Sequence, residues 1–312
     1  MNKYVVTGAS GFIGGKLVQH LLQLGHTVIG IDKSNFPYDL STAQRKLFHF
    51  SKFDLTGDEA ELSKIIGTSD AIFHLSANSS IKMGSVDRNL DLQQNVIVTK
   101  NILEAMIVKN APKRIIFTSS SAVYGQARIL PTSEEYGPLQ PMSLYAASKL
   151  ACEALISAYC YMFGLTSLIL RLANITGNND THGIIYDFKK QIQTDSTKLI
   201  ILSDGKPRKS YVYVDDCVLA MALGLSFPRK GVEIVNVGNI DQIDVMTIAR
   251  LFVEIQKLHS TSIDIAGGNP NDGGGWKGDV VNAFMNIDKI RTLGWSPSLN
   301  STETIKKTIS LL

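Results

Sequence analysis

Short apolar runs alternate with amphipathic stretches over the first 170 or so residues of the chain. The runs are typical of buried parallel strands, and the stretches between them place apolar residues at helical spacing. The expected strands lie at Tyr4–Val6, Thr27–Ile31, within Phe48–Leu55, and at Ala71–Leu75, Arg114–Phe117 and Thr166–Leu170, and the expected helices at Lys16–Leu24, Asp58–Ile66, Leu90–Met106 and Tyr145–Phe163. This alternation predicts an α/β fold with a doubly wound parallel sheet of the Rossmann type and right-handed crossovers.

The alternation breaks after Thr176. Elements are still expected at Ile184–Ile192, Leu199–Leu202, Tyr211–Val214, from Asp215 to about Phe227, and at Val235–Gly238 and Val245–Leu258. This part predicts a smaller α/β lobe interleaved with the first domain. We expect the first domain to comprise residues 1–176 plus about 209–238, and the lobe about 177–208 and 239–312.

Composition and charge indicate a globular protein and give no sign of a nucleic-acid-binding or membrane protein. A content of 44% hydrophobic and 19% charged residues is typical of a globular chain, and a net charge of +3 gives no reason to expect nucleic acid or a membrane surface as a partner. The longest apolar stretch, residues 217–227, is about half of what a membrane span needs, and the first expected strand begins too early to leave room for a signal peptide.

Three cysteines without a CxxC spacing predict neither a disulfide framework nor a zinc site, which favours a cytoplasmic location. His74 and His182 lack a helix-spaced acidic or histidine partner, so no metal site is expected.

The first expected strand runs directly into a glycine-rich turn with the sequence TGASGFIG, residues 7–14. Gly8 and Gly11 would let the backbone turn tightly beside a pyrophosphate, and Gly14 would let the following helix pack closely on the strand. The phosphates would then lie at the helix N-terminus. In this strand, turn and helix context the glycines predict a dinucleotide site rather than a structural turn.

Two carboxylates follow the next two strands. Asp32 lies eighteen residues after Gly14, where it can accept hydrogen bonds from an adenosine ribose and would repel a 2′-phosphate, so it favours NAD over NADP. The adjacent Lys33 weakens that preference. Asp54 could meet the adenine amino group, or it could instead cap the helix that follows.

Polar residues also follow the two central strands. Ser76 and Ala77 come after the fourth strand, and Thr118 to Ser121 after the fifth, at the sheet edge where doubly wound folds bind ligands. The hydroxyls could equally be ordinary turn residues. Asn95, on the long helix before the fifth strand, could be a ligand or a solvated side chain.

Tyr145 and Lys149 are spaced one helical turn apart, so they share a helix face. A lysine there could stabilise the tyrosinate. Bringing the phenol pKa from about 10 to near neutrality needs about 4 kcal/mol of differential stabilisation, which a cation, some burial and a second hydrogen bond could supply together. A YxxxK pair is common by chance, and its meaning depends on the surrounding motifs.

Taken in order, the motifs resemble the extended short-chain dehydrogenase/reductase family and, within it, the nucleotide-sugar epimerases of the UDP-galactose (UDP-glucose) 4-epimerase type. The resemblance covers essentially the whole chain and rests on TGASGFIG, HLSA at 74–77, SSSAVYG at 119–125, YAASK at 145–149, KSYVYVDD at 209–216, GDV at 278–280 and LGW at 293–295. HGIIYDF at 182–188 and GWKGDV at 275–280 are similar to the compact archaeal type.

This resemblance implies roles for individual residues. The catalytic set would be Ser120, Tyr145 and Lys149, with Tyr145 as the acid/base for the sugar 4-hydroxyl and Lys149 holding the nicotinamide ribose. The cofactor NAD would meet Gly8, Ser10, Gly11, Phe12, Ile13, Gly14, Asp32, Lys33, Asp54, Leu55, Leu75, Ser76, Ala77, Asn95, Thr118, Tyr145, Lys149 and Leu172. The substrate would meet Ser79, Ser120, Ser121, Tyr145, Asn174, Ile184, Ile185, Lys209, Trp276 and Asp279.

The first domain would therefore bind NAD and the lobe a nucleotide sugar, most simply a UDP-hexose, in a homodimer that packs the helix from Leu90 against that from Tyr145. The apolar stripe of Cys152, Ile156 and Tyr159 fits such packing, and burial within one chain explains it equally well.

Departures from the family pattern lie in the lobe. Lys209 stands where the family usually has a phosphate-binding arginine, and Trp276 stands where a second arginine is common; a lysine neutralises phosphate without bidentate geometry. The size-limiting position of related epimerases corresponds to Ala283, or to Phe284 if the alignment slips by one. A small residue there would admit a 2-acetamido group, and so UDP-GlcNAc and UDP-GalNAc.

Other functions remain open at this point. The dehydratase branch of the family carries an Asp and a Glu where this chain has Ser121 and Ala122, which favours an epimerase over a dehydratase. Another short-chain reductase, or an NAD-binding regulatory protein without catalysis, is also compatible with the fold, although the regulatory protein would have no need of the Ser120, Tyr145 and Lys149 set.

Overall fold

A computed structural model describes residues 2–108, 110–227, 230–268 and 273–312, and the chain divides into two compact units. Unit 1 comprises Met1–Ser120, Leu144–Arg171 and Val218–Val235, and unit 2 comprises Ser121–Ser143, Leu172–Cys217 and Asn236–Leu312. The units follow compactness, whereas the predicted domains follow binding roles, so the domain boundaries given above stay a prediction.

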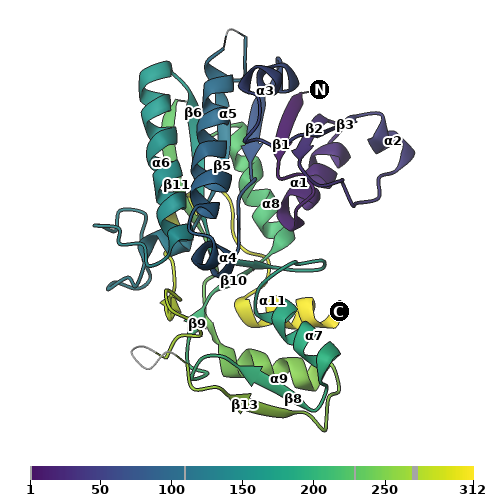
Figure 1. Ribbon diagram of the computed structural model, residues 1–312, viewed down its shortest axis with the longest axis vertical. Helices are drawn as coiled ribbons and strands as arrows, with labels where there is room; N and C mark the ends of the chain where they lie inside the picture. The colour runs from purple at the N-terminus through teal and green to yellow at the C-terminus, as the bar shows by residue number, and fades with distance from the viewer. Residues whose placement is uncertain (1, 109, 228–229, 269–272) are drawn as a thin grey trace. The chain divides into compact units, whose positions relative to one another are not determined.

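Unit 1 is built on a seven-stranded sheet with the strand order β11-β6-β5-β4-β1-β2-β3 (Figure 1). The strands are β1 Lys3–Thr7, β2 Thr27–Asp32, β3 Phe48–Lys52, β4 Ala71–His74, β5 Arg114–Ser120, β6 Thr166–Leu172 and β11 Gly231–Val237. Strands β3, β2, β1, β4 and β5 pair in parallel. The predicted doubly wound Rossmann sheet is confirmed, and its order reverses where β4 pairs with β1.

Helices cover this sheet, and α3, α5 and α6 pack together on one face (Figure 1). The helices are α1 Phe12–Gln23, α2 Thr42–Arg45, α3 Glu59–Ile66, α4 Ile81–Val86, the π-helix η1 Leu92–Ile97, α5 Val98–Ile107, α6 Leu144–Phe163, α8 Val214–Ala222, which starts in unit 2, and the 3₁₀ turn η3 Leu223–Leu225. The core that they enclose includes Ile72, Ile102, Ile115, Cys152 and Ile156. Burial within unit 1 therefore accounts for Cys152 and Ile156 of the stripe considered above.

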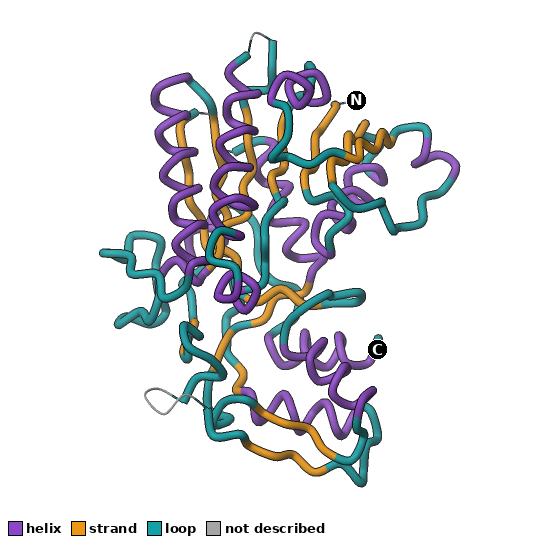
Figure 2. Tube along the Cα trace, viewed as in Figure 1, coloured by secondary structure: helices purple, strands orange, loops and turns teal. Residues whose placement is uncertain are grey.

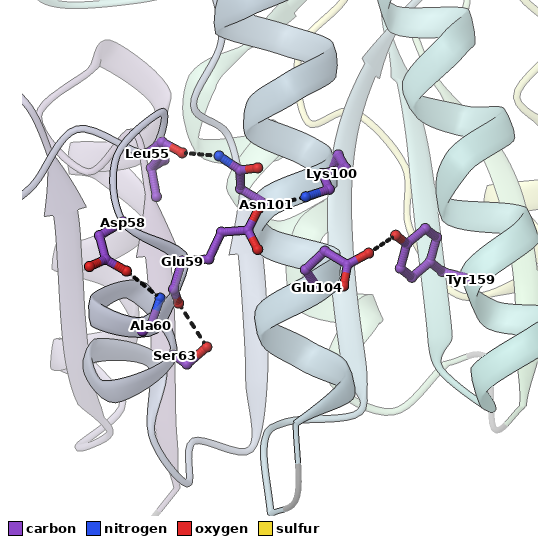
Figure 3. A network of polar contacts seen from close by, with 9 residues as sticks. All are labelled: Leu55, Asp58, Glu59, Ala60, Ser63, Lys100, Asn101, Glu104 and Tyr159. Carbon is purple, nitrogen blue, oxygen red and sulfur yellow. Dashed lines mark hydrogen bonds and ion pairs between the residues drawn. The ribbon is translucent and has the colours of Figure 1, made fainter.

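Polar contacts fix α5 between its neighbours (Figure 3). Lys100 forms an ion pair with Glu59 on α3, and Tyr159 on α6 donates a hydrogen bond to Glu104. Asp58 caps α3 by accepting hydrogen bonds from Ala60 N and Glu61 N. These contacts position the helix whose N-terminal extension, η1, carries Asn95.

The described part of unit 2 contains short strands and the longer helices α7, α9 and α11 (Figure 2). Its elements are the 3₁₀ turn η2 Ser121–Tyr124, β7 Asn174–Thr176, α7 Ile184–Thr194, β8 Lys198–Ile201, β9 Arg208–Lys209, β10 Tyr211–Tyr213, β12 Ile243–Asp244, α9 Val245–Ile255, β13 Ser262–Ile265, β14 Asn282–Ala283, α10 Asp288–Thr292 and α11 Ser301–Ser310. Small sheets pair β10 with β7, β13 with β8, and β9 with both β12 and β14. The core of unit 2 includes Phe188, Ile248, Phe252 and Ile305.

Candidate active site

The glycine-rich turn between β1 and α1 has a conformation that needs its glycines. Gly8 has a φ of +68°, and a β-carbon there would lie 2.8 Å from Ser76 N. A β-carbon at Gly14 would lie 2.0 Å from Gly8 O, so Gly14 lets α1 pack on the turn. Gly11 is the N-cap of α1 and provides no side-chain cap, so the helix N-terminus at Phe12 and Ile13 suits an anion.

Asp32 lies at the end of β2 and faces the same turn. Its Oδ2 accepts a hydrogen bond from Ser10 N at 3.1 Å and its Oδ1 accepts one from Ser34 N at 2.9 Å. Ser10 Oγ donates to Ser34 O. Lys33 Nζ instead donates to Gln94 Oε1 at 3.1 Å, so its ammonium group is engaged away from the carboxylate of Asp32.

Asp54 follows β3 and closes a turn by accepting hydrogen bonds from Thr56 N and Oγ1, which hold the pKa of its carboxyl below the usual value. The helix cap is Asp58, so the alternative prediction that Asp54 caps α3 is wrong. Leu55 is buried, and its carbonyl accepts a hydrogen bond from Asn101 Nδ2 (Figure 3).

The segment after β4 meets the glycine turn at the point where the strand order reverses. Leu75 N and Ser76 N both donate to Thr7 Oγ1, the last residue of β1. Ala77 continues this segment and is partly buried, whereas Ser79 is exposed beside the N-cap of α4. The structure therefore brings the predicted residues Gly8, Leu75 and Ser76 together at the topological switch point.

Ser120, Tyr145 and Lys149 come together at the carboxyl end of β5. Tyr145, in the first turn of α6, forms a hydrogen bond with Ser120, the last residue of β5. Lys149 is 3% exposed, and its Nζ donates to Thr118 O at 2.8 Å and lies 4.8 Å from the centre of the Phe117 ring. One of the three ammonium donors is thus occupied, which leaves two that could bind hydroxyl groups.

The protonation of this pair differs from the prediction. Burial raises the pKa of Tyr145 to about 12, although the Ser120 hydrogen bond partly opposes the rise. Burial lowers the pKa of Lys149 to about 8, although the nearby Cys152, Glu153 and Asp91 oppose the fall. Burial therefore outweighs the hydrogen bond from Ser120 and favours the protonated form of Tyr145, so these side chains by themselves do not give the near-neutral pKa that a cation, some burial and a second hydrogen bond were expected to supply together.

Asn95 is 1% exposed and lies in the π-helix η1, so the solvated alternative for this residue is wrong. Its Nδ2 donates to Ser148 Oγ at 2.7 Å, and its Oδ1 accepts a hydrogen bond from Asn78 N at 2.7 Å. Its side chain thus bridges the segment after β4 to α6, the helix that carries Tyr145 and Lys149.

A second polar cluster lies in unit 2. Lys209 Nζ forms an ion pair with Asp279 Oδ1 at 2.6 Å and lies 5.6 Å from the centre of the Trp276 ring. Asp279 Oδ2 accepts a hydrogen bond from Gly275 N at 3.1 Å. Trp276 is 45% exposed, so this cluster combines one cation, one carboxylate and an accessible aromatic face.

A small cavity of about 10 Å³ adjoins the cluster in unit 2 and has room for about one water molecule. It is lined by Ser121, Ala173, Asn174, Lys209, Ser210, Ala283 and Met285. Ser210 Oγ is buried and has no hydrogen-bond partner among the described residues. The cavity therefore gathers Ser121, Asn174 and Lys209 from the predicted substrate set, and Ala283 rather than Phe284 from the two alternatives.

Three other predicted residues lie in more apolar surroundings in unit 2. Ile185 is 1% exposed and belongs to the hydrophobic core, and Ile184 packs against the same core at the start of α7. Leu172 ends β6 and is buried. A polar ligand could reach Ile184 or Ile185 mainly through the backbone at the start of α7.

Several residues at these sites carry no local sequence signal. Tyr38 donates a hydrogen bond from its hydroxyl to Gly11 O at 2.9 Å, and its ring occupies the place of a β-carbon at Gly15. Asp91 and Ser148 complete the contacts of Asn95. The contacts of Tyr38 and Ser148 join residues far apart in the chain, and only the small residue at Gly15 hints at one of them, whereas Asp91 lies four residues before Asn95.

Within residues 2–108, 110–227, 230–268 and 273–312, His, Cys, Asp and Glu side chains form no group of three or more that could hold a metal ion. In the same ranges we find no helix long and apolar enough to cross a membrane.

A family model, curated relatives and a solved structure all match this chain over most of its length. A family model described as "NAD dependent epimerase/dehydratase family" matches residues 4–238. A UDP-glucose 4-epimerase of Mycolicibacterium smegmatis is 33% identical, covering 98% of this chain and 96% of the relative. A UDP-glucuronate 4-epimerase of Thermodesulfobacterium geofontis is 28% identical, covering 99% and 96%. A crystal structure of a UDP-galactose 4-epimerase matches with a TM-score of 0.86 and 31% identity, covering 99% of this chain and 98% of that one.

Proposed function

The chain belongs to the NAD dependent epimerase/dehydratase family, and we propose that it is a nucleotide-sugar 4-epimerase that interconverts UDP-glucose and UDP-galactose through a transient 4-keto sugar. The observation that carries the proposal is the cluster of Ser120, Tyr145 and Lys149 at the carboxyl end of β5. Epimerisation at a carbinol carbon needs one group to move a proton and a redox cofactor to take and return a hydride.

The residues of unit 1 fit NAD. Gly8 and Gly14 lie where a β-carbon would clash, the N-terminus of α1 is free of a side-chain cap, and Asp32 presents a carboxylate beside the turn. These features suit a pyrophosphate at the helix N-terminus and an adenosine ribose at Asp32. NAD, when bound, supplies the acceptor for the C4 hydride and a positive charge that favours the tyrosinate.

Each catalytic residue then has a separate task. Tyr145 would take the proton from the sugar 4-hydroxyl and return a proton to the 4-keto oxygen as the other epimer forms. Ser120 hydrogen-bonds Tyr145 and orients its hydroxyl. Lys149, anchored by Thr118 O, uses its two remaining donors to hold the ribose hydroxyls and adds positive charge near the phenol.

The residues after β5 favour this reaction over dehydration. Loss of water across C5 and C6 of the sugar needs an additional acid and base, and Ser121 and Ala122 carry no ionisable side chain. Epimerisation needs neither, so the residues present suffice.

In unit 2, the proposal assigns the nucleotide diphosphate to the cluster around Lys209. Its ammonium group would neutralise a phosphate, Asp279 would accept hydrogen bonds from a ribose, and Asn174 would bind a phosphate or sugar hydroxyl. Ala283, which lines the cavity, would leave room for a 2-acetamido group, so the proposal extends to UDP-GlcNAc and UDP-GalNAc.

The substrate is tested with a panel of UDP-, dTDP-, GDP- and CDP-sugars, in which NMR reads the configuration at C4. We expect turnover of UDP-glucose, UDP-galactose and their 2-acetamido counterparts. Turnover of the unacetylated pair alone would remove the role given to Ala283, and turnover of UDP-glucuronate alone would replace the proposed sugar.

The mechanism is tested by Tyr145→Phe, which removes the hydroxyl and keeps the ring. We expect turnover to fall by at least about 100-fold, while the variant still binds NAD in isothermal titration calorimetry. A variant with normal turnover would refute the proton transfer by Tyr145. A wild-type protein that binds NAD and turns over no sugar would instead support a regulatory role.

The proposal also includes a homodimer and a cytoplasmic location. Small residues are exposed along α6 at Ala147, Ala154 and Ala158, followed by Tyr161 at 93% exposure, at the alternating spacing of a helix-packing seam. In the proposed homodimer, this seam would pack on the helices from Leu90 and from Tyr145 of the second copy. The three cysteines are free and buried, which suits a reducing compartment.

A further inference from the structure

A buried carboxylate lies just before the π-helix η1. Asp91 is 2% exposed, and its Oδ1 accepts hydrogen bonds from Asn78 Nδ2 at 2.8 Å and from Asn95 Nδ2 at 3.4 Å. Asn95 Nδ2 also donates to Ser148 Oγ, and Ser148 Oγ donates to Tyr145 O at 2.7 Å. Three hydrogen bonds therefore connect Asp91 to the backbone of the catalytic tyrosine.

The second oxygen of Asp91 is buried without a hydrogen-bond partner in the described part of the chain. It lies against α4, because a β-carbon at Gly84 would be 2.0 Å away. No described side chain forms an ion pair with Asp91, whose burial raises the pKa of its carboxyl. An uncompensated carboxylate in this position costs stability, so its presence calls for a function.

Lys149 is the cation whose charge lowers the pKa of this carboxyl, and Asp91 in turn raises the pKa of Lys149. The titratable groups around Lys149 are Asp91 before η1, Cys152 and Glu153 on α6, and His74 on β4. Burial raises the pKa of the Cys152 thiol, which keeps it neutral, and burial lowers the pKa of His74 to about 3, which keeps that ring neutral.

Glu153 already has a cationic partner. Its carboxylate forms an ion pair with Arg171 at 2.7 Å and accepts a hydrogen bond from Ser119. Asp91 is therefore the one carboxylate among these groups that has no ion-pair partner within the described ranges.

We propose that Asp91 is a positioning residue for the 4-epimerase reaction, which orients the first turn of α6 through Asn95 and Ser148 and supplies the negative charge that opposes the ammonium group of Lys149. This inference rests on the proposed function. Asp91 touches neither Tyr145 nor Lys149 directly, so it acts through the intervening side chains and through space. Its removal should impair the chemical step and leave substrate affinity intact.

The test is Asp91→Asn, which keeps the shape and the Oδ1 acceptor and removes the charge. We expect kcat to fall roughly 10- to 100-fold, as for a catalytic group that loses its orientation, with KM for the sugar nucleotide unchanged. Because Asp91 raises the pKa of both Lys149 and Tyr145, both limbs of the kcat/KM profile should move to lower pH. A purely structural role would lower the melting temperature and leave the profile in place.

A second pair of variants separates the two roles proposed for Asp91, namely the orientation of α6 and the charge beside Lys149. Ser148→Ala breaks the connection and keeps Asp91, so we expect a lower kcat without the shift of the pH profile, and Ser148→Thr should restore kcat because it retains the hydroxyl. The matched control is Asp87→Asn, an exposed carboxylate four residues earlier whose Oδ1 accepts a hydrogen bond from Asn89 N; its kinetics should equal those of the wild type.

A folded Asp91→Asn protein with the kcat and pH profile of the wild type would overturn the inference about Asp91. The proposed function would still stand, provided that the wild-type protein turns over a sugar nucleotide. If the wild type turns over no sugar in the panel above, the proposed function itself fails. The two failures are therefore distinguishable.

Discussion

His74 shows how a single residue is fixed in one protonation state. It is fully buried, with Nδ1 2.9 Å from Thr7 Oγ1 and Nε2 3.0 Å from Thr99 Oγ1. The Thr99 hydroxyl gives its proton to Asn95 O or Cys152 Sγ, so it must accept from Nε2–H. Nδ1 therefore accepts a hydrogen bond from Thr7, and this assignment fits only the neutral ring.

The neutral state of His74 predicts a pH dependence of stability. Burial lowers its pKa from 6.5 to about 3, so below pH 6.5 the unfolded state binds a proton that the folded state excludes. The stability that His74 contributes is therefore complete above pH 6.5 and is lost as the pH falls towards 3. Between pH 8 and 4.5, urea unfolding should show a smaller fall in the free energy of unfolding for His74→Gln than for the wild type.

The control for this experiment is His49→Gln, which replaces an exposed histidine and should show the same fall in unfolding free energy at low pH as the wild type. If the unfolding free energy of His74→Gln fell with pH as steeply as that of the wild type, the assignment of a neutral ring to His74 would be contradicted.

At the residue scale, the sequence predicted the groups whose spacing is local. Tyr145 and Lys149 share a helix face, and Gly8 and Gly14 belong to one turn, so the chain order alone brings each pair together. Asp91 lies 58 positions before Lys149 in the chain, and its role depends on helix packing that no local pattern records. The pKa of Tyr145 moves in the direction opposite to the expected one for a similar reason, because burial by packed elements outweighs the hydrogen bond from Ser120.

At the scale of elements, a buried ion pair joins α6 to two strands. Arg171 on β6 contacts both oxygens of Glu153 on α6, which also accepts a hydrogen bond from Ser119 on β5. Both charged side chains are 4% exposed. Such a pair adds little net stability compared with apolar residues, but it is costly to break from one side.

Arg171→Met should therefore lower the free energy of unfolding by about 3–5 kcal/mol, because it leaves Glu153 buried without a counter-ion. Adding Glu153→Leu should recover much of the loss, since it removes the unpaired charge. Urea unfolding measures both. Lys198→Ala, which breaks an exposed pair with Asp195, is the control and should leave the midpoint unchanged. Equal effects of Arg171→Met and Lys198→Ala would contradict this account.

The long elements were predictable and the short ones were not. The strands of the parallel sheet and helices such as α5 and α6 lie within a few residues of their expected positions, because apolar periodicity over many residues identifies them. The strands β9, β12 and β14 have two residues each, and no periodicity exists over that length. The π-helix η1 was also missed, since backbone hydrogen bonds between residues five apart, and not a sequence pattern, distinguish it from a regular helix.

For the whole molecule, the proposed homodimer predicts a solution mass of two chains. Size-exclusion chromatography with light scattering measures it directly. Ala158→Glu places a charge on the exposed seam of α6 and should give a mass of one chain, whereas Ala43→Glu, at an exposed alanine of α2, should leave the dimer intact. A wild-type mass of one chain would remove the homodimer from the proposal.

The division into units has a consequence for recombination between relatives. Each unit consists of three segments, so the chain passes from one unit to the other five times, the first two times within one residue of Ser120 and of Tyr145. No single gene crossover can therefore exchange one whole unit and leave the other whole, and a crossover between residues 121 and 235 exchanges parts of both units. A chimera that takes all of unit 2 from a relative with another sugar needs three separate inserts, whose five junctions follow residues 120, 143, 171, 217 and 235.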